Sequence, residues 1–276
     1  MNVLITGANG YIGRHVVAAV CDLGHNVIAC DIQFTDKDPR VKYVECDLFN
    51  DDLNGIYKRL GSPDVCIHMA WRNGFIHNSD SHILDLSSHF RFLQAIINEG
   101  LKHVAVMGSM HEVGYWEGAI DETTPCNPSS LYGIAKDALR RAMVNYCQDK
   151  GVLLQWIRAY YILGDDTRNN SIFSKLIKAA CEGKETFPFT SGKTKYDFIT
   201  VDELAYQIAR PISQDKIIGI INCCSGKPVT LSERVEQFIA DNQLNIKLEY
   251  GAYPDRPYDS PIVYGDAEKI NKICNS

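Results

Sequence analysis

The sequence has no long hydrophobic run, no surplus of positive charge and no CxxC motif. None of its apolar stretches reaches the roughly 20 residues that a membrane-spanning helix needs, so we expect no membrane partner. The formal net charge of −6 gives no general attraction for nucleic acid, and we predict none as a partner. A small anionic ligand needs only a few local positive groups and is compatible with this charge.

The ten cysteines lack the spacing of a zinc site or of a disulfide-rich secreted domain. Cys30, Cys46 and Cys66 lie in or beside apolar, strand-like segments. We therefore expect small core residues in a reducing compartment, and no metal site. The first residues, MNVLITGANGYIG, lack the basic n-region and cleavage pattern of a signal peptide, so we expect a cytoplasmic protein.

The first 160 residues alternate between apolar, strand-like runs and segments with helical periodicity. The expected strands are NVLITG, HNVIACD, VKYVECD, DVCIHMA, KHVAVMGS and VLLQWIRA. Near-continuous apolar strands separated by helices indicate an α/β fold with a parallel sheet covered on both faces. Beyond residue 160 the alternation loosens and most of the prolines occur, so we expect a second, smaller region there.

The segment GANGYIG places Gly7, Gly10 and Gly13 between the first strand and the first helix. Gly7 allows a tight turn, and Gly10 lets a pyrophosphate approach the backbone. Gly13 lets the helix lie close to the sheet. The helix N-terminus then offers N–H groups and partial positive charge to phosphates. The pattern is GxxGxxG rather than GxGxxG, and its context between strand and helix predicts a dinucleotide site.

Acidic residues follow the second and third expected strands. Asp31 closes the second strand, 18 residues after Gly13. A carboxylate there accepts hydrogen bonds from ribose hydroxyls and repels a 2′-phosphate, so we predict NAD(H), with NADP(H) as the alternative. Asp47, after the third strand, is predicted to face the adenine. His68, at the end of the fourth strand, is expected to be structural.

Tyr132 and Lys136 are four residues apart, a spacing that places both on one helical face. Hydride transfer to or from a carbonyl needs a proton donor and acceptor. A nearby ammonium favours the phenolate and lowers the pKa of a tyrosine. Ser109, at the end of a strand 23 residues before Tyr132, would orient the carbonyl. A YxxxK pair also arises by chance, so this prediction depends on the glycine loop and on Asp31.

Together these motifs resemble the extended short-chain dehydrogenase/reductases of the NAD-dependent epimerase/dehydratase family. The matching segments, from residue 2 to residue 205, are TGANGYIG, CDL, HMA, GSMHEVGY, DETTPCNPSSLYGIAK, IRAYYILG and YDFITVDELA. The resemblance implies a Rossmann domain that binds NAD over residues 1–160. It implies a lobe that binds a nucleoside-diphosphate sugar, mainly residues 161–276. Residues 194–210 would return to the first domain, so the two regions are expected to interleave.

The resemblance also implies roles for individual residues. Ser109, Tyr132 and Lys136 would be catalytic, with Tyr132 as acid/base. The cofactor would contact Gly7, Gly10, Tyr11, Ile12, Gly13, Asp31, Asp47, Leu48, Met69, Ala70, Ser87, Tyr132, Lys136 and Ile162. The sugar nucleotide would contact His111, Asn170 and Arg256, with Lys175 as a further candidate for the diphosphate. Tyr160 and Tyr161 line the sugar site or pack in the core. A homodimer through the LDLSSHFRFLQAI helix and the Tyr132 helix is expected.

Three reactions share this arrangement: 4-epimerisation, 4,6-dehydration and 4-keto reduction. In the family, a dehydratase carries Asp-Glu directly after the catalytic hydroxyl, but here Met110 and His111 follow Ser109. Glu112 comes one position later. The short C-terminal region favours a reductase or dehydrogenase acting at C4 of a nucleotide-linked 6-deoxyhexose, of the dTDP-4-keto-6-deoxyhexose type. The alternative is a nucleotide-sugar 4-epimerase; a dehydratase and a non-catalytic NAD sensor are less favoured.

Overall fold

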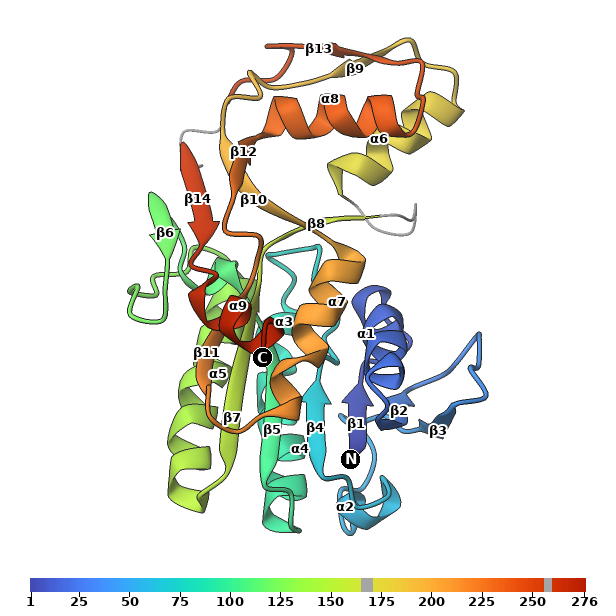
Figure 1. Cartoon of the computed structure of the whole chain (residues 1–276), viewed down its shortest axis with the longest axis vertical. Coiled ribbons are helices and arrows are strands. Elements are labelled where there is room, and N and C mark those ends of the chain that lie inside the picture. The colour runs from blue at the N-terminus through green and yellow to red at the C-terminus, as the bar shows by residue number, and fades with distance from the viewer. Residues whose placement is uncertain (165–170, 256–259) are drawn as a thin grey trace.

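The central element of the fold is a seven-stranded parallel sheet (Figure 1). The computed structural model describes residues 1–164, 171–255 and 260–276. The strands are β1 (Asn2–Thr6), β2 (Asn26–Asp31), β3 (Val41–Glu45), β4 (Val65–His68), β5 (His103–Ser109), β7 (Leu153–Ala159) and β11 (Gly219–Cys223). Their order is β11-β7-β5-β4-β1-β2-β3. The order reverses between β1 and β4, where a crevice opens at the carboxyl ends. The predicted doubly wound Rossmann fold is confirmed.

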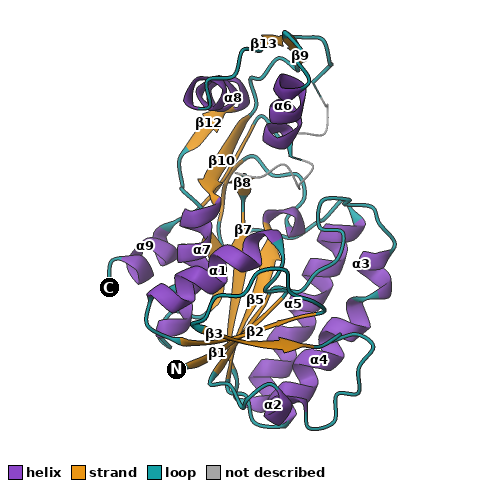
Figure 2. Ribbon diagram, turned by 90° about the vertical axis from the view of Figure 1, so that its right-hand side faces the viewer, coloured by secondary structure: helices purple, strands orange, loops and turns teal. Residues whose placement is uncertain are grey.

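Helices cover both faces of this sheet (Figure 2). One layer contains α1 (Tyr11–Asp22), α7 (Val201–Ala209) and α9 (Glu268–Cys274); the other contains α2 (Ile56–Arg59), α3 (Ser81–Leu84), α4 (Leu86–Asn98) and α5 (Leu131–Lys150). Successive side chains of β1 point to opposite faces of the sheet and therefore pack against both helical layers. Val3 and Ile5 pack in the core beneath α1 and α7, and Leu4 packs in the core beneath α4 and α5.

β11 was not among the six expected strands. Its sequence, GIINC, is a short apolar run in the region where the strand–helix alternation is lost. Only its parallel pairing with β7, from Gly219–Gln155 to Cys223–Ala159, makes it a strand. The earlier segment YDFITVDELA, expected to return to the first domain, forms most of β10 and the start of α7, and α7 packs against α1 of the main sheet.

A smaller lobe lies beyond the carboxyl edge of the sheet (Figure 1). It contains α6 (Ile172–Cys181), α8 (Leu231–Asp241), β8 (Tyr161–Leu163), β9 (Thr186–Pro188), β10 (Lys195–Thr200), β12 (Pro228–Thr230), β13 (Lys247–Glu249) and β14 (Ile262–Gly265). The strand order is β12-β10-β14-β6, where β6 is Gly118–Ile120; β8 pairs with β10, and β9 pairs with β13. Phe173, Phe189, Phe198 and Val235 belong to its own core. Two 3₁₀ helices, η1 (Met110–Glu112) and η2 (Pro211–Ser213), complete the described elements.

All ten cysteines are free thiols. In the part of the chain that the structure describes, no three His, Cys, Asp or Glu side chains are grouped so that they could hold a metal ion. Within the same residues, none of the helices combines the length and the apolar character needed to span a bilayer.

Candidate active site

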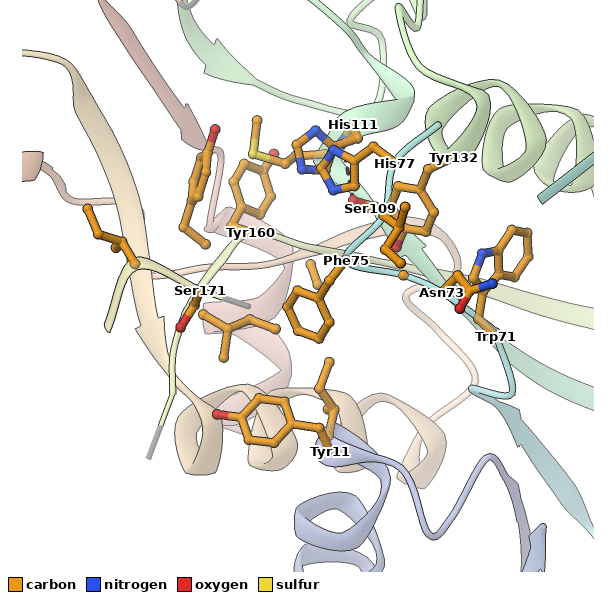
Figure 3. A pocket seen from close by; sticks show the side chains of 18 of the residues that line it. Tyr11, Trp71, Asn73, Phe75, His77, Ser109, His111, Tyr132, Tyr160 and Ser171 are labelled. Carbon is orange, nitrogen blue, oxygen red and sulfur yellow. Dashed lines mark hydrogen bonds between the residues drawn. The ribbon is translucent and has the colours of Figure 1, made fainter. Parts of the chain in front are cut away.

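A cavity of about 2140 Å³ lies between the carboxyl edge of the main sheet and the smaller lobe (Figure 3). This volume exceeds the roughly 300–1,000 Å³ of a typical small-molecule site, which leaves room for two ligands. The predicted residues that line it are Gly7, Gly10, Tyr11, Ile12, Gly13, Asp31, Asp47, Leu48, Met69, Ala70, Ser109, His111, Tyr132, Lys136 and Ile162. The lobe adds Lys175, and Tyr160 and Tyr161 lie at the junction. Segments far apart in the sequence therefore meet here.

The glycine loop is shaped by close backbone contacts. Gly7 has a φ of +69°, and a Cβ atom on it would lie 2.6 Å from the backbone nitrogen of Ala70. A Cβ atom on Gly13 would lie 2.1 Å from the carbonyl oxygen of Gly7. Helix α1 begins after Gly10, and no side chain among the described residues caps it with a hydrogen bond. The backbone of the first turn is thus presented to the cavity, as an anionic ligand requires.

Asp31 lies at the end of β2, beside the glycine loop. Its carboxylate accepts hydrogen bonds from the backbone N–H groups of Asn9 (2.9 Å) and Ile32 (2.8 Å). These bonds hold the carboxylate at the cavity, and its two oxygens have further acceptor capacity. Asp47 accepts hydrogen bonds from the N–H of Phe49 (3.0 Å) and from the side chain of Asn50 (2.7 Å), so it shapes the turn after β3 as well as lining the cavity.

The three predicted catalytic residues line the cavity at the carboxyl end of β5, and Figure 3 shows Ser109 close to Tyr132. Ser109 ends β5, and Tyr132 is in the first turn of α5, which begins after Ser130. The Ser130 hydroxyl accepts a hydrogen bond from the Gly133 N–H at 3.2 Å and fixes this helix start. Lys136, one turn further along, donates from Nζ to the Met107 carbonyl oxygen at 2.6 Å.

The acid–base properties of this group differ from the expectation that Lys136 lowers the pKa of Tyr132. Burial raises the pKa of Tyr132 to about 12, although its hydrogen bond with Ser109 acts in the opposite direction. Burial also lowers the pKa of Lys136 to about 7, against the attraction of the Glu112 carboxylate. The lysine Nζ lies 5.9 Å from the centre of the tyrosine ring. Desolvation of both groups therefore outweighs their mutual interaction in this structure.

The cavity residues that sequence reasoning missed include Trp71 and His77, in the loop after β4. The His77 ring stacks on Tyr132 with 5.3 Å between ring centres and 12° between planes, and it also contacts His111 at 4.3 Å. The His77 carbonyl accepts the Tyr132 N–H at 2.8 Å. Burial lowers the pKa of His77, and that of His111 to about 3, so both rings are neutral. The only sequence signal was a polar, aromatic loop at the carboxyl end of a parallel strand.

His68 is buried, as expected for a structural residue. Its Nδ1 lies 2.8 Å from the Thr6 hydroxyl and its Nε2 lies 3.0 Å from Nδ1 of His89. Burial lowers the pKa of His68 to about 3. The ring therefore joins β1, β4 and α4 as a neutral hydrogen-bonding group.

One predicted cofactor contact does not line the cavity. Ser87 is exposed on α4 and is not part of the cavity lining. The buried face of α4 consists of His89, Phe92, Leu93, Ile96 and Ile97. Ser87 does not lie on this face. Two predicted substrate contacts, Asn170 and Arg256, lie outside the described residues.

Comparison with known proteins agrees with this geometry. Residues 3–224 match the NAD dependent epimerase/dehydratase family. The dTDP-6-deoxy-L-talose 4-dehydrogenase (NAD(+)) of Aggregatibacter actinomycetemcomitans is 45% identical over 272 residues, covering 96% of this chain and 99% of the relative.

Solved structures share the fold. The UDP-N-acetylglucosamine 4-epimerase of Methanobrevibacter ruminantium M1 superposes with a TM-score of 0.84 at 22% identity, covering 99% of this chain and 91% of that one. The UDP-glucose 4-epimerase of Thermotoga maritima gives 0.82 at 20% identity, covering 99% and 92%. The resemblance inferred from the sequence motifs is confirmed, and with it the prediction of an enzyme: the chain belongs to the NAD dependent epimerase/dehydratase family.

Proposed function

We propose that this protein is an NAD(H)-dependent oxidoreductase that acts at C4 of a dTDP-linked 6-deoxyhexose. It would interconvert dTDP-6-deoxy-L-talose and the corresponding 4-keto sugar. The observation that carries this proposal is the 45% identity, over 99% of its length, to a dTDP-6-deoxy-L-talose 4-dehydrogenase. The cavity supports it, because Ser109 and Tyr132 meet at a sheet edge next to a phosphate-binding loop. The direction of net reaction would follow the ratio of oxidised to reduced cofactor.

The residues present fit NAD(H). The glycine loop is a cradle that a Cβ atom at Gly7 or Gly13 would fill, and it leads into the N-terminus of α1. Asp31 would hold the adenosine ribose through its carboxylate. Asp47 and Ile162 line the same cavity. We propose that Asp47 lies near the adenine and Ile162 near the nicotinamide. When bound, the cofactor supplies or accepts the hydride at the sugar C4.

The residues of the chain would manage the proton. In the oxidation direction, the Tyr132 oxygen accepts the proton of the C4 hydroxyl, and in reduction it returns that proton to the alkoxide. The Ser109 hydroxyl holds O4 by a hydrogen bond beside Tyr132. A charged Lys136 favours the phenolate that this cycle requires. His111 and His77, both neutral, would offer hydrogen bonds to the remaining sugar hydroxyls, and Lys175 would approach the diphosphate.

Turnover of defined substrates tests the proposal. Purified protein is incubated with dTDP-6-deoxy-L-talose and NAD⁺, and reduced cofactor is followed by its absorbance. We expect NADH to accumulate in proportion to a 4-keto product that NMR identifies. The UDP- and GDP-linked analogues are the controls for the nucleotide. If the sugar is inverted at C4 without net NADH formation, the protein is a 4-epimerase. If neither reaction occurs with any of these sugars, the proposal is wrong.

The proposed role of Asp31 predicts a change in cofactor preference. Because hydrogen bonds to charged groups contribute about 1.5–3 kcal/mol, Asp31→Ala is expected to raise the ratio of kcat/KM for NADP(H) over NAD(H) by about 10- to 100-fold. Initial rates with the two cofactors measure this ratio. Asp36→Ala, which removes an exposed carboxylate outside the cavity, serves as the matched control. An unchanged ratio in Asp31→Ala would contradict the assignment.

The structure adds no support for the dehydratase alternative. Glu112, the nearest candidate for the additional acid, is fully buried and absent from the cavity lining. We further propose that residues 1–160 and 194–210 form the cofactor-binding part and that residues 161–276 supply most of the sugar-nucleotide site. The homodimer through α4 and α5 stays a prediction.

A further inference from the structure

Lys136 is a buried lysine whose ammonium group has, among the described residues, few hydrogen-bonding partners and no ion pair. Lys136 is only 2% exposed, and its Nζ donates a hydrogen bond to the carbonyl oxygen of Met107 at 2.6 Å. In the described part of the chain no carboxylate lies within ion-pair distance of it. Burying an ammonium group without a counter-charge favours loss of its proton. Some other group must offset this desolvation if the lysine is to act as a cation.

The indole of Trp71 is placed to do so. Lys136 Nζ lies over the Trp71 ring, 3.7 Å from the ring centre. This is well inside the roughly 6 Å range in which the negative face of an aromatic ring attracts a cation. Tryptophan has the strongest such face, and the interaction grows when both groups are removed from water. Trp71 and Tyr132 meet edge to face, with 6.0 Å between ring centres (Figure 3), so the indole, the ammonium and the phenol form one contiguous group.

The indole is held in this orientation by neighbours in two helices. Its Nε1–H donates to Nδ1 of His82 at 3.0 Å, and Nε2 of His82 in turn lies 3.0 Å from the carbonyl oxygen of Ile76. His89 stacks flat against the indole at 4.2 Å and 15°. Burial lowers the pKa of His89 well below its usual value. The stacked imidazole is therefore neutral and does not compete with the lysine for the ring.

The other titratable groups around Lys136 do not replace this contact. They are Tyr132 on its own helix, Glu112 in η1, His68 in β4 and His89 in α4. The two histidines are neutral, and Tyr132 is a neutral phenol in this structure. Glu112 attracts the lysine, but its hydrogen bonds are with Ser109, Trp156 and Arg158. Trp71 is the aromatic face that contacts the ammonium directly.

We propose that Trp71 is a positioning residue that keeps Lys136 protonated, and held beside Tyr132, through a cation–π contact. This inference rests on the proposed function for its catalytic meaning, but the contact itself does not depend on which sugar is bound. It assigns a role to the residue that follows the HMA segment, a position for which the sequence motifs gave none.

The titration of Lys136 tests the contact directly. The full-length protein is labelled with [ε-¹³C]lysine, and the Lys136 signal is assigned by its loss in Lys136→Arg. Removing the aromatic face in Trp71→Leu is expected to lower the pKa of Lys136 by about one pH unit. Tryptophan fluorinated on its benzo ring, incorporated at position 71, keeps the shape but weakens the negative face. It is expected to give a smaller shift in the same direction, and it guards against misfolding of Trp71→Leu.

The pH dependence of kcat/KM for the proposed substrate provides the second readout. Activity that requires the ammonium falls as pH rises through the pKa of Lys136. The fall is therefore expected to move to lower pH in both Trp71 variants, by the shift seen in the titration. A Lys136 titration unchanged in the fluorinated protein overturns the inference. If the Lys136 pKa falls as expected in the Trp71 variants but the protein turns over no nucleotide sugar, the contact is supported and only the proposed function is contradicted.

Discussion

Tyr132→Phe is expected to lower kcat for the proposed C4 oxidation by about 10²- to 10⁴-fold, the range of general acid–base catalysis. The substitution removes the hydroxyl that is proposed to exchange the proton with O4. It keeps the ring that stacks on His77 and meets Trp71 edge to face. We therefore expect KM for the sugar nucleotide and the affinity for NADH to change by less than about threefold. Steady-state rates and NADH fluorescence measure the two effects separately.

Tyr146→Phe is the matched control, because it removes a hydroxyl from the same helix at a distance from the cavity. That hydroxyl donates to the Asn98 side chain at 2.7 Å, and its loss should leave kcat unchanged. A rate within about threefold of wild type in Tyr132→Phe, less than a single tenfold acid–base effect, would show that Tyr132 is not the acid/base. Loss of NADH binding in this variant would instead assign the tyrosine to cofactor binding.

The parts of this protein that local sequence could predict are those set by short-range physics. Largely apolar runs bounded by helices predicted six of the seven strands, because strands buried on both faces, such as β1 and β4, have no polar alternation. The glycine loop was predictable because close backbone contacts, such as Gly13 against the Gly7 carbonyl, exclude side chains. Parallel strands place their carboxyl ends on one edge, so Asp31 and Ser109 could be expected at one cavity.

The remaining features depend on contacts between distant segments. β11 exists because β7 offers an unpaired edge, and nothing in GIINC alone distinguishes it from a buried loop. Trp71 gains its proposed role from Lys136, 65 residues later in the chain. The acid–base state of Tyr132 and Lys136 could not be predicted from their i, i+4 spacing, since it is dominated by desolvation. Burial is a property of the whole fold.

Glu112→Ala is expected to cost about 3–5 kcal/mol in the free energy of unfolding, because it leaves a buried cation without its partner. The Arg158 guanidinium and the Glu112 carboxylate are both fully buried and approach to 3.5 Å. The same carboxylate accepts the Ser109 N–H at 2.7 Å and the Trp156 indole N–H at 2.9 Å. Urea unfolding followed by circular dichroism measures the loss, and Glu117→Ala, an exposed position nearby, should leave the midpoint nearly unchanged.

Glu112→Gln separates this structural role from a chemical one. The amide retains the size of the side chain and one acceptor oxygen for the Ser109 or Trp156 N–H, so it is expected to destabilise less than alanine. Because Glu112 lies outside the cavity lining, C4 turnover by the folded Glu112→Gln protein should stay within about tenfold of wild type, short of the 10²- to 10⁴-fold loss expected when an acid or base is removed. A larger loss in a fully folded variant would mean that the carboxyl group takes part in proton transfer, as a dehydratase would require. Burial raises the pKa of Glu112, although the positive charge of Arg158 acts in the opposite direction. The enclosed carboxyl group accepts the Ser109 N–H and so fixes the end of β5 and the position of the Ser109 hydroxyl.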